Sequence, residues 1–551
     1  MSRESRTQLF LRIITLACVV GGLLAAFLLS VQGGTAGPYV TVRGVVLGVD
    51  GPLANAIVQV RATDNVTRTA ANGAFTLTHV APGVPLPVTA WFDGYYVAQR
   101  EVVPPATGVT LILRPYPTTD NPDYAWMFPH RADSPPDVDS GCDACHAEVV
   151  VAQWQDNAHA HSARSPRFLS MYNGTGVTGT EVVSPGYKLD FPGTSGNCAN
   201  CHAPGAAVDA PFSTDMNALT PPESDGVFCD FCHKIAQVYL DPATGLPYPN
   251  MPGVLSYDVR RPPEGQDIFF GPYADVPEPD TYLPVITRSQ FCAPCHSFSF
   301  WGVPIYTSYP EWLASPYARQ DVQCQTCHMA PDPDVDHFVA PENGGYIRDP
   351  MTIPSHKQPG AGDVELLQHT VQMDVSAEQV GGLLAVTVTI TNTGAGHHVP
   401  TGSPIRHMIL TVAVTDEEGH TIPLRAGLRT PSWAGAQAGL PGKVYAKVLQ
   451  DVRTGETPVA SYWKPTRIVS DTRIPALGVD RTVYLFAPPA GESEIHVRTR
   501  LILRPLFADL IERKGWNVSD IRMAQKDVHR TVRVFRALFP LLVLPPGDDT
   551  T

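Results

Sequence analysis

The chain has 551 residues, 54 of them proline, and a formal net charge of -14 at pH 7. This acidic balance excludes a nucleic-acid-binding protein, which requires a basic face, and it suits a soluble exterior or a basic redox partner. The chain is too long for one core, so three or four domains are expected. The many prolines predict short helices in its middle part.

The N-terminus has the pattern of a membrane anchor. Residues 1–12 carry three arginines against one acid, and Ile13–Val31 then runs for 19 residues without a charge, which is enough to span a bilayer as a helix. Because basic residues stay on the cytoplasmic side, we expect a single-pass signal-anchor in the cytoplasmic membrane. The bulk of the chain would lie on the outer (periplasmic or extracellular) face. Two alternatives remain open, which are cleavage near Gly33–Gly37 and lipidation of Cys18.

Residues 39–115 alternate apolar and polar positions in the manner of strands. Turns rich in glycine with asparagine or aspartate separate these runs. The expected strands are Tyr39–Val46, Ala56–Arg61, Ala74–Val80 and Val88–Phe92. The pattern predicts a small antiparallel β-sandwich.

The order of these elements resembles a carboxypeptidase regulatory-like domain. Two stretches carry the resemblance, which are Gly51–Val60, ending in the alternating Val58 and Val60, and the hairpin Asn72–Leu77. The resemblance implies a spacer or contact module, and nothing in this part of the sequence has the pattern of a catalytic site.

Five copies of C-x-x-C-H lie in the segment that we assign to residues 116–362. In this motif the two cysteines form thioethers with a haem, and the histidine becomes the proximal ligand of its iron. A zinc cluster or a thioredoxin-like pair would not require a histidine after every second cysteine. The cysteines expected to bind five haem c groups are Cys142, Cys145, Cys198, Cys201, Cys229, Cys232, Cys292, Cys295, Cys324 and Cys327. The proximal iron ligands are His146, His202, His233, His296 and His328.

This segment offers little chain for each haem, so the porphyrins themselves are expected to form its core. The aromatic residues expected to pack against them are Trp154, Phe228, Phe231, Phe291, Trp301 and Trp312. The unequal intervals between the motifs predict two close haem pairs, the second with the third and the fourth with the fifth. Ten of the 11 cysteines lie in the motifs, which leaves no disulfide framework. Haem attachment of this kind takes place outside the cytoplasmic membrane, so the chain requires export.

The same segment resembles the cytochrome c554-like multihaem cytochromes. Trp154–Ser162 is similar to a signature that follows the first haem motif in that family, although Asn157 stands where a serine-type residue is usual. The resemblance implies that His159 is a distal ligand, reaching a haem other than the nearest one. Phe291–Met329, with its E-W-x-x-S-P-Y element, is similar to a second block of the family.

Further histidines are expected to complete the irons, because a strong sixth ligand closes an iron and makes it an electron carrier. The candidates are His159, His337, His397, His161 and His356, and further ones are His130 and His369. His398 would face away from its neighbour His397 if the backbone is extended. Methionine ligation by Met329 is the alternative, although that side chain is interpreted as packing. The sequence does not assign a histidine to a particular iron.

We expect residues 363–515 to form a second all-β sandwich, followed by a tail at residues 516–551. The alternating runs are Leu383–Thr391, Met408–Val414 and Val483–Phe486. Asn392–Gly402 and Asp471–Pro475 resemble elements of the C-terminal domain in the same multihaem proteins. Glycines in the first element would let the backbone approach a haem edge, so His397 could join the sandwich to the haem core.

Three functions are compatible with this organisation. The first is electron transfer through closely packed haems, between redox proteins such as a quinol-oxidising complex or soluble cytochromes. The second is a reductase or oxidase of a small nitrogen or sulfur compound at one open haem, as in relatives that convert hydroxylamine, nitrite or tetrathionate. The third is a surface structural or filament protein. A C-x-x-C-K motif is absent and there are five haem motifs rather than eight, which favours the carrier over the enzyme.

Overall fold

The structure is a computed structural model that describes residues 39–127, 129 and 141–534. It divides into two compact units. The first runs to Tyr116 and includes Tyr273–Tyr282, and the second contains Pro117–Pro272 and the chain from Leu283 onward. The predicted signal-anchor with Cys18, and also His130, lie outside the described residues. Among the described residues, no helix has the length and apolar character needed to cross a membrane.

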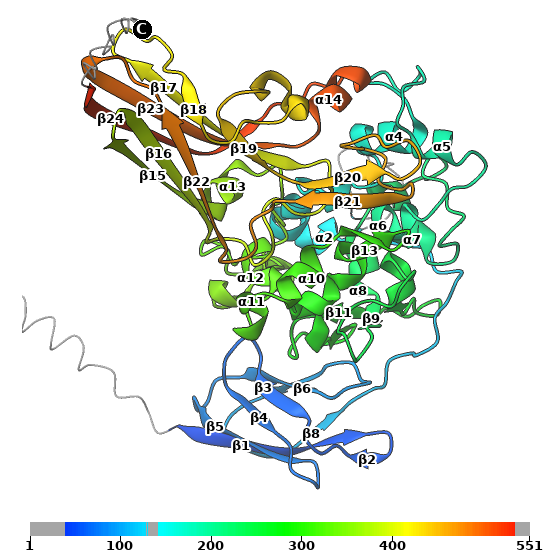
Figure 1. Cartoon of the computed structure of the whole chain (residues 1–551). Coiled ribbons are helices and arrows are strands. Elements are labelled where there is room, and N and C mark those ends of the chain that lie inside the picture. Colours follow the sequence, from blue (N-terminus) through cyan, green and yellow to red (C-terminus); the bar gives the residue numbers. More distant parts are fainter. Residues whose placement is uncertain (1–38, 128, 130–140, 535–551) are drawn as a thin grey trace, which may run out of the picture. The chain divides into compact units, whose positions relative to one another are not determined.

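The first unit contains two four-stranded sheets, as the alternation of its sequence predicts (Figure 1). One sheet has the order β2-β1-β5, with β8 pairing parallel to β1, and the other has the order β4-β3-β6-β7. The strands are β1 (Val40–Gly48), β2 (Gly51–Pro52), β3 (Ile57–Val60), β4 (Val66–Arg68), β5 (Ala74–Val80), β6 (Leu86–Trp91), β7 (Ala98–Val102) and β8 (Ala106–Ile112). Alternate side chains such as Val42, Val46 and Val58 are buried in one core.

A segment from the middle of the chain completes this unit, which corrects the expectation that all of residues 116–362 belong to the haem segment. Tyr273–Tyr282, with β12 (Asp280–Tyr282), packs here. The Thr281 hydroxyl accepts a hydrogen bond from Trp91 Nε1 at 3.0 Å, and Asp275 Oδ2 accepts one from the Ala62 N–H at 2.6 Å. These contacts span about two hundred residues of chain. No local pattern could therefore have indicated them.

The haem segment is poor in regular structure, as its prolines predicted. Its longest described helix, α4, has 8 residues and begins at a proline, where the missing N–H costs nothing. The helical elements are α2 (Asp143–His146), η1 (Ala147–Val151), α3 (Ala152–Gln155), η2 (His159–His161), α4 (Pro166–Asn173), α5 (Tyr187–Asp190), α6 (Ala199–His202), α7 (Pro204–Ala207), η3 (Glu223–Asp225), α8 (Cys229–His233), η4 (Gly253–Ser256), η5 (Pro284–Thr287), η6 (Ser289–Phe291), α9 (Ala293–His296), α10 (Ser308–Leu313), α11 (Pro316–Arg319), α12 (Cys324–His328), η7 (Pro341–Asn343) and η8 (Pro350–Thr352). Short strands are β9 (Ile235–Val238), β10 (Tyr257–Val259), β11 (Phe269–Gly271), β13 (Phe298–Phe300) and β14 (Val303–Tyr306).

Most of the expected aromatic residues are buried in this segment. Trp154, Phe228, Phe231 and Trp312 are at most 5% exposed. Trp301 is 65% exposed, which corrects the expectation that it packs inside. It occupies the two-residue turn between β13 and β14 with a φ of 53°, and such a turn places its residues at the tip of a hairpin.

The C-terminal region forms a second pair of four-stranded sheets, as predicted. Their orders are β15-β16-β22-β18 and β19-β17-β23-β24, and Figure 1 shows them as two layers. The elements are α13 (Val364–Thr370), β15 (Val371–Val380), β16 (Leu383–Asn392), β17 (His407–Asp416), β18 (Leu424–Ala426), η9 (Ser432–Gln437), β19 (Gly442–Tyr445), β20 (Lys447–Asp451), β21 (Thr466–Asp471), β22 (Val479–Phe486), β23 (Gly491–Arg504), α14 (Ala508–Lys514) and β24 (Ile521–Val534).

The sandwich extends beyond the boundary at residue 515, so the expected tail is wrong up to Val534. Strand β24 pairs with β23 along its whole length. Its outward side chains are charged or polar, and only Met523 and Val532 belong to its buried core. A strand with so few buried apolar positions has a weak alternation signal, which explains why the sequence did not predict it.

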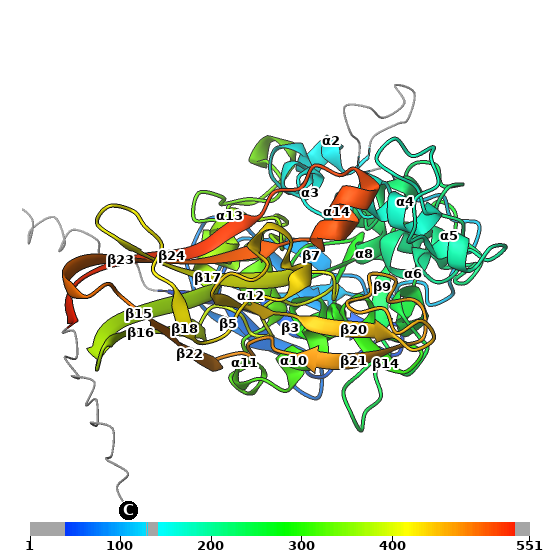
Figure 2. The same ribbon diagram turned by 45° about the horizontal axis from the view of Figure 1, so that its top comes forward.

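The β20–β21 ribbon lies against the haem segment in both views (Figures 1 and 2). Leu449 and Val459 pack with Ile305 in one small core. The Lys447 ammonium, almost fully buried, donates hydrogen bonds to the Pro304 and Ile305 carbonyls at 3.0 and 3.3 Å. The haem segment and the sandwich are therefore joined by a shared interior within one compact unit.

A second buried lysine joins them at α14. The side chain of Lys514 is 1% exposed. Its ammonium donates to four backbone carbonyls, those of Ser170, Thr175, Val183 and Pro185, at 2.6 to 3.1 Å. The Ser170 carbonyl at α4 also accepts the N–H groups of Gly174 and Thr175, and the Thr175 carbonyl accepts the Ser170 hydroxyl. The charged amine adds a donor for the Val183 and Pro185 carbonyls of the loop after α4.

We expect Lys514→Met to lower the stability of the protein by about 3 kcal/mol, because the Val183 and Pro185 carbonyls lose a charged donor while the apolar stem is kept. Thermal unfolding followed by circular dichroism measures the change. Lys526→Met on the exposed face of β24 is the control and should leave the midpoint unchanged. Equal midpoints for both variants would show that the carbonyl cage contributes nothing.

Candidate haem sites

Each C-x-x-C-H motif forms one short helical turn, in α2, α6, α8, α9 and α12. Residues three and four apart in a helix lie on the same face. The turn therefore brings the two cysteines and the histidine of each motif to one side. None of the ten motif cysteines forms a disulfide, so all are available for thioether bonds.

Four of the five motif histidines are held by a backbone carbonyl. The Nδ1 contacts are His146 to Phe338 O at 2.8 Å, His202 to Ser162 O at 3.1 Å, His233 to Phe270 O at 2.8 Å and His328 to Pro359 O at 2.7 Å. A carbonyl only accepts, so Nδ1 carries the proton and Nε2 keeps its lone pair for a metal. The sequence did not predict these partners, because a backbone carbonyl has no residue signature.

His159 and His296 face each other from distant parts of the segment. Their ring centroids lie 6.2 Å apart with the planes at 84°. An iron between the two rings would make two metal–nitrogen bonds of about 2 Å each. These bonds, added to the distance from each coordinating nitrogen to the centroid of its ring, give roughly this separation. Gln358 Oε1 lies 2.5 Å from His159 Nδ1 and sets the same tautomer as in the motif histidines. The pair therefore fits one iron between the two rings.

His328 and His397 form a second such pair. Their centroids lie 6.4 Å apart and their planes are almost parallel, at 17°. His397 Nδ1 lies 2.9 Å from the carbonyl oxygen of His398. His397 comes from the turn after β16, so the C-terminal sandwich supplies one ring of this pair.

Burial disfavours the charged form of several of these histidines. It lowers the pKa of His296 to about 3. It also lowers the pKa of His159, His202 and His233. The neutral imidazole is the form that binds a metal, so the environment suits the predicted haem iron.

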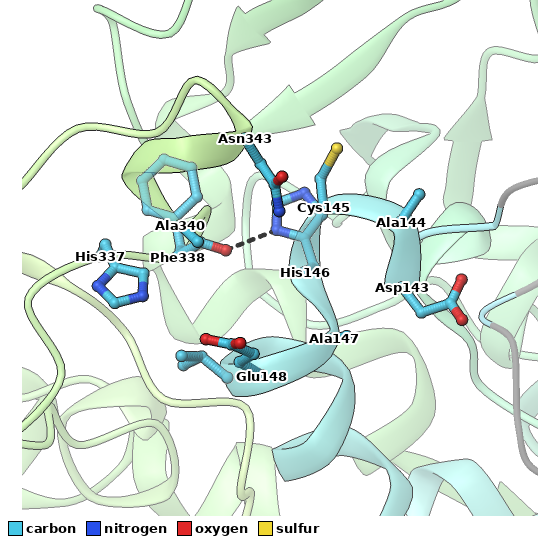
Figure 3. A pocket seen from close by; sticks show the side chains of 11 residues that line it. Asp143, Ala144, Cys145, His146, Ala147, Glu148, His337, Phe338, Ala340 and Asn343 are labelled. Atoms are coloured by element: carbon cyan, nitrogen blue, oxygen red, sulfur yellow. Dashed lines mark hydrogen bonds between the residues drawn. The ribbon is translucent and has the colours of Figure 1, made fainter.

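The remaining candidate histidines have different surroundings. Figure 3 shows that His337 borders the same pocket as His146 of the first motif, and its Nδ1 lies 2.7 Å from Asp336. His356 is within electrostatic reach of His233 and His146, and burial lowers its pKa to about 4. His161 is exposed and has no ring partner among the described residues. His369 is also exposed, with Nδ1 2.8 Å from the Glu365 carbonyl oxygen.

The second motif has surroundings that the sequence did not predict. The His202 ring stacks on Phe168 at 4.0 Å, and no histidine ring faces it among the described residues. Tyr306 donates a hydrogen bond to Tyr462 at 2.7 Å, and both phenols lie within electrostatic reach of Cys198. The Arg406 guanidinium lies close to both phenols, and burial lowers its pKa. These three residues come from β14 and the C-terminal region, so only the fold brings them together.

Cysteines of different motifs lie close enough to shift one another's pKa. Cys229 lowers the pKa of Cys142, Cys295 raises the pKa of Cys201, and Cys324 raises the pKa of Cys292. Cys232 of the third motif is within electrostatic reach of Cys295. These pairs therefore link the first motif to the third and the second to the fourth, and the fourth to the fifth. The expected fourth–fifth neighbours agree with this, but the sequence intervals paired the second motif with the third.

Two comparisons with known proteins found similarities to cytochromes. The family model described as cytochrome c554 and c-prime matches residues 141–234. A penta-haem cytochrome c552 from Thermochromatium tepidum has a similar structure, with a TM-score of 0.51 and 21% sequence identity, over 71% of this chain and 97% of that chain. No curated protein matches at a significant level.

Two further structures are much less similar. One is a structural-genomics target, with a TM-score of 0.14 and 12% identity over 34% of this chain and 99% of that chain. The other is the ASH/PapD-like domain of human CEP192, with a TM-score of 0.13 and 8% identity over 31% of this chain and 89% of that chain. Neither score supports an argument about the fold.

The family match covers the first three motifs, and the fold similarity covers most of the chain. The cysteines of each motif are free, and the motif histidines present a nitrogen to a metal. Sequence, geometry and comparisons together support a multihaem c-type cytochrome with covalently bound haem c.

Proposed function

We propose that this protein carries electrons through five covalently bound haems held close together outside the cytoplasmic membrane. The observation that supports it best is the nearness of attachment cysteines that belong to different motifs, which shift one another's pKa. Each of these sulfurs would be joined to a haem by a thioether, so the haems attached there would lie close together. The haems supply the redox chemistry, and the chain orders them and keeps them apart from water.

The histidine pairs support specific ligand assignments within this proposal. His159 completes the fourth haem opposite His296, and His397 completes the fifth opposite His328. His356 serves the third or the first haem, and His337 is placed for the first. Bis-histidine ligation closes an iron to substrates and gives a lower potential than histidine–methionine ligation, as suits a carrier.

The setting of this carrier is also a proposal. Ile13–Val31 would anchor it, and its partners would be a quinol-oxidising complex or soluble cytochromes with basic docking surfaces, given the net charge of -14. The first unit would be a carboxypeptidase regulatory-like module that acts as a spacer or contact domain, and its two sheets are compatible with that role.

A reductase at the second haem is the second candidate. Among the described residues, no histidine ring contact with His202 is found, and the half-buried Arg406 lies with two tyrosines beside this motif. An open iron next to a cation would accept a small anion such as nitrite. The two candidates therefore differ in the ligation of a single haem.

Low-temperature EPR of the oxidised protein separates them. A carrier is expected to show only low-spin haem, with a spectrum that does not change when nitrite or hydroxylamine is added. Intact mass should show five haem additions. One high-spin haem that responds to nitrite would favour the reductase, and a different haem number would contradict the motif interpretation.

We expect His159→Ala to convert one low-spin haem to high-spin, because the fourth iron loses its distal ligand. His161→Ala is a matched control, since it removes a histidine from the same short helix that has no ring partner among the described residues. Its spectrum should equal that of the unmodified protein. If both variants retain every low-spin haem, the assignment of His159 is wrong.

A further inference from the structure

Glu311 of α10 holds the turn that carries His397. Its carboxylate, on a side chain only 6% exposed, accepts a hydrogen bond from the His398 N–H at 3.2 Å and from the Thr401 hydroxyl at 2.8 Å. The ring of His398 also lies 3.4 Å from this carboxylate. A residue of the haem segment therefore binds the backbone directly after the ligand candidate.

Asn392 holds the same peptide group from its other side. Its Nδ2 donates to the His397 carbonyl at 2.8 Å and to the Ile474 carbonyl at 3.1 Å. Hydrogen bonds therefore hold the peptide group between His397 and His398 at both its carbonyl and its N–H. These two groups fix the direction in which the His397 side chain leaves the backbone.

The Glu311 carboxylate is itself braced. Arg473, 5% exposed, donates to it at 2.6 Å and also binds Asp471 at 2.8 Å. The Thr307 hydroxyl donates to it at 2.5 Å and accepts from the Lys447 ammonium at 2.9 Å. Arg473 and Lys447 belong to the sandwich, so the carboxylate is held by both parts of the unit.

The turn needs such an anchor because it is built from glycine. A Cβ on Gly394 would lie 2.2 Å from the His369 carbonyl oxygen, and one on Gly396 would lie 3.4 Å from Trp312 and Tyr317. The close approach at Gly394 requires a residue without a side chain, whereas the contact at Gly396 is an ordinary van der Waals distance. The two glycines leave the backbone of the turn intrinsically free. The conformation of the turn is therefore fixed by its hydrogen bonds with Glu311 and Asn392.

We propose that Glu311, braced by Arg473, is a positioning residue that sets His397 on the fifth haem. A residue of the haem segment thereby sets the orientation of the ligand that the sandwich supplies. The ligation of the fifth haem then depends on correct docking of the sandwich. This inference rests on the proposed assignment of His397 as the distal ligand.

The test compares Glu311→Ala with Glu342→Ala, which changes an exposed glutamate of the same segment. Low-temperature EPR counts the high-spin haems in each oxidised holoprotein. We expect one low-spin haem to become high-spin in Glu311→Ala only, and added imidazole to restore it by taking the open position. A loss of stability alone would change the melting temperature but would not create an imidazole-sensitive haem.

Two further variants keep the test decisive. Glu311→Gln preserves size but cannot serve all the donors at once, so the same high-spin signal is expected at lower intensity. It carries the test if the alanine variant does not accumulate. His397→Ala is measured in parallel. If it retains every low-spin haem, the ligand assignment itself fails. If it becomes high-spin while both Glu311 variants remain low-spin, the assignment stands and the positioning role is overturned.

Discussion

The pairing of imidazoles from distant parts of the chain is the constraint on which the second unit depends. A motif histidine is fixed locally, by its own helical turn and one carbonyl. In the proposed ligation, the ring opposite it comes from elsewhere in the chain. His159 and His397 reach His296 and His328 across 137 and 69 residues of chain, at 6.2 and 6.4 Å between ring centroids. The loops between them are arranged to meet this requirement.

One short segment, Ser355–Pro359, serves several sites at once. The His356 backbone is tied to α3 and the loop after it, with its N–H bound to Gln153 and its carbonyl to Asn157, each at 2.7 Å. Gln358 holds the ring of His159, and the Pro359 carbonyl holds the ring of His328. A loop that contributes to three sites couples their geometries, so a change in it would affect several haems together.

The interior of this unit is unusually polar for physical reasons. Haem-bearing loops form few regular hydrogen-bond ladders, and their carbonyls must still be satisfied when buried. Lys514 and Lys447 meet this need with ammonium groups bound to carbonyls. The Glu311–Arg473 pair does the same for the turn of the sandwich. Removing one partner of the Glu311–Arg473 pair would leave a buried charge without compensation. The pair therefore specifies one arrangement of the turn rather than adding much stability.

The sequence alone determined the cofactor and its attachment, because covalent haem binding is encoded in five contiguous residues. It also determined the two strand-rich regions, since alternation with a period of two is local. It singled out His159, His337, His397, His356 and His161 as ligand candidates, and His161 has no ring partner among the described residues. Tertiary structure decided what depends on separation in space. It decided which motifs lie close together and which ring faces His296 or His328, and it showed that Tyr273–Tyr282 joins the first unit. It also decided that Glu311 meets the turn after Asn392. These contacts join residues that are far apart in the chain. Several of them are made by backbone carbonyls, which every residue has, so the residue types do not indicate them.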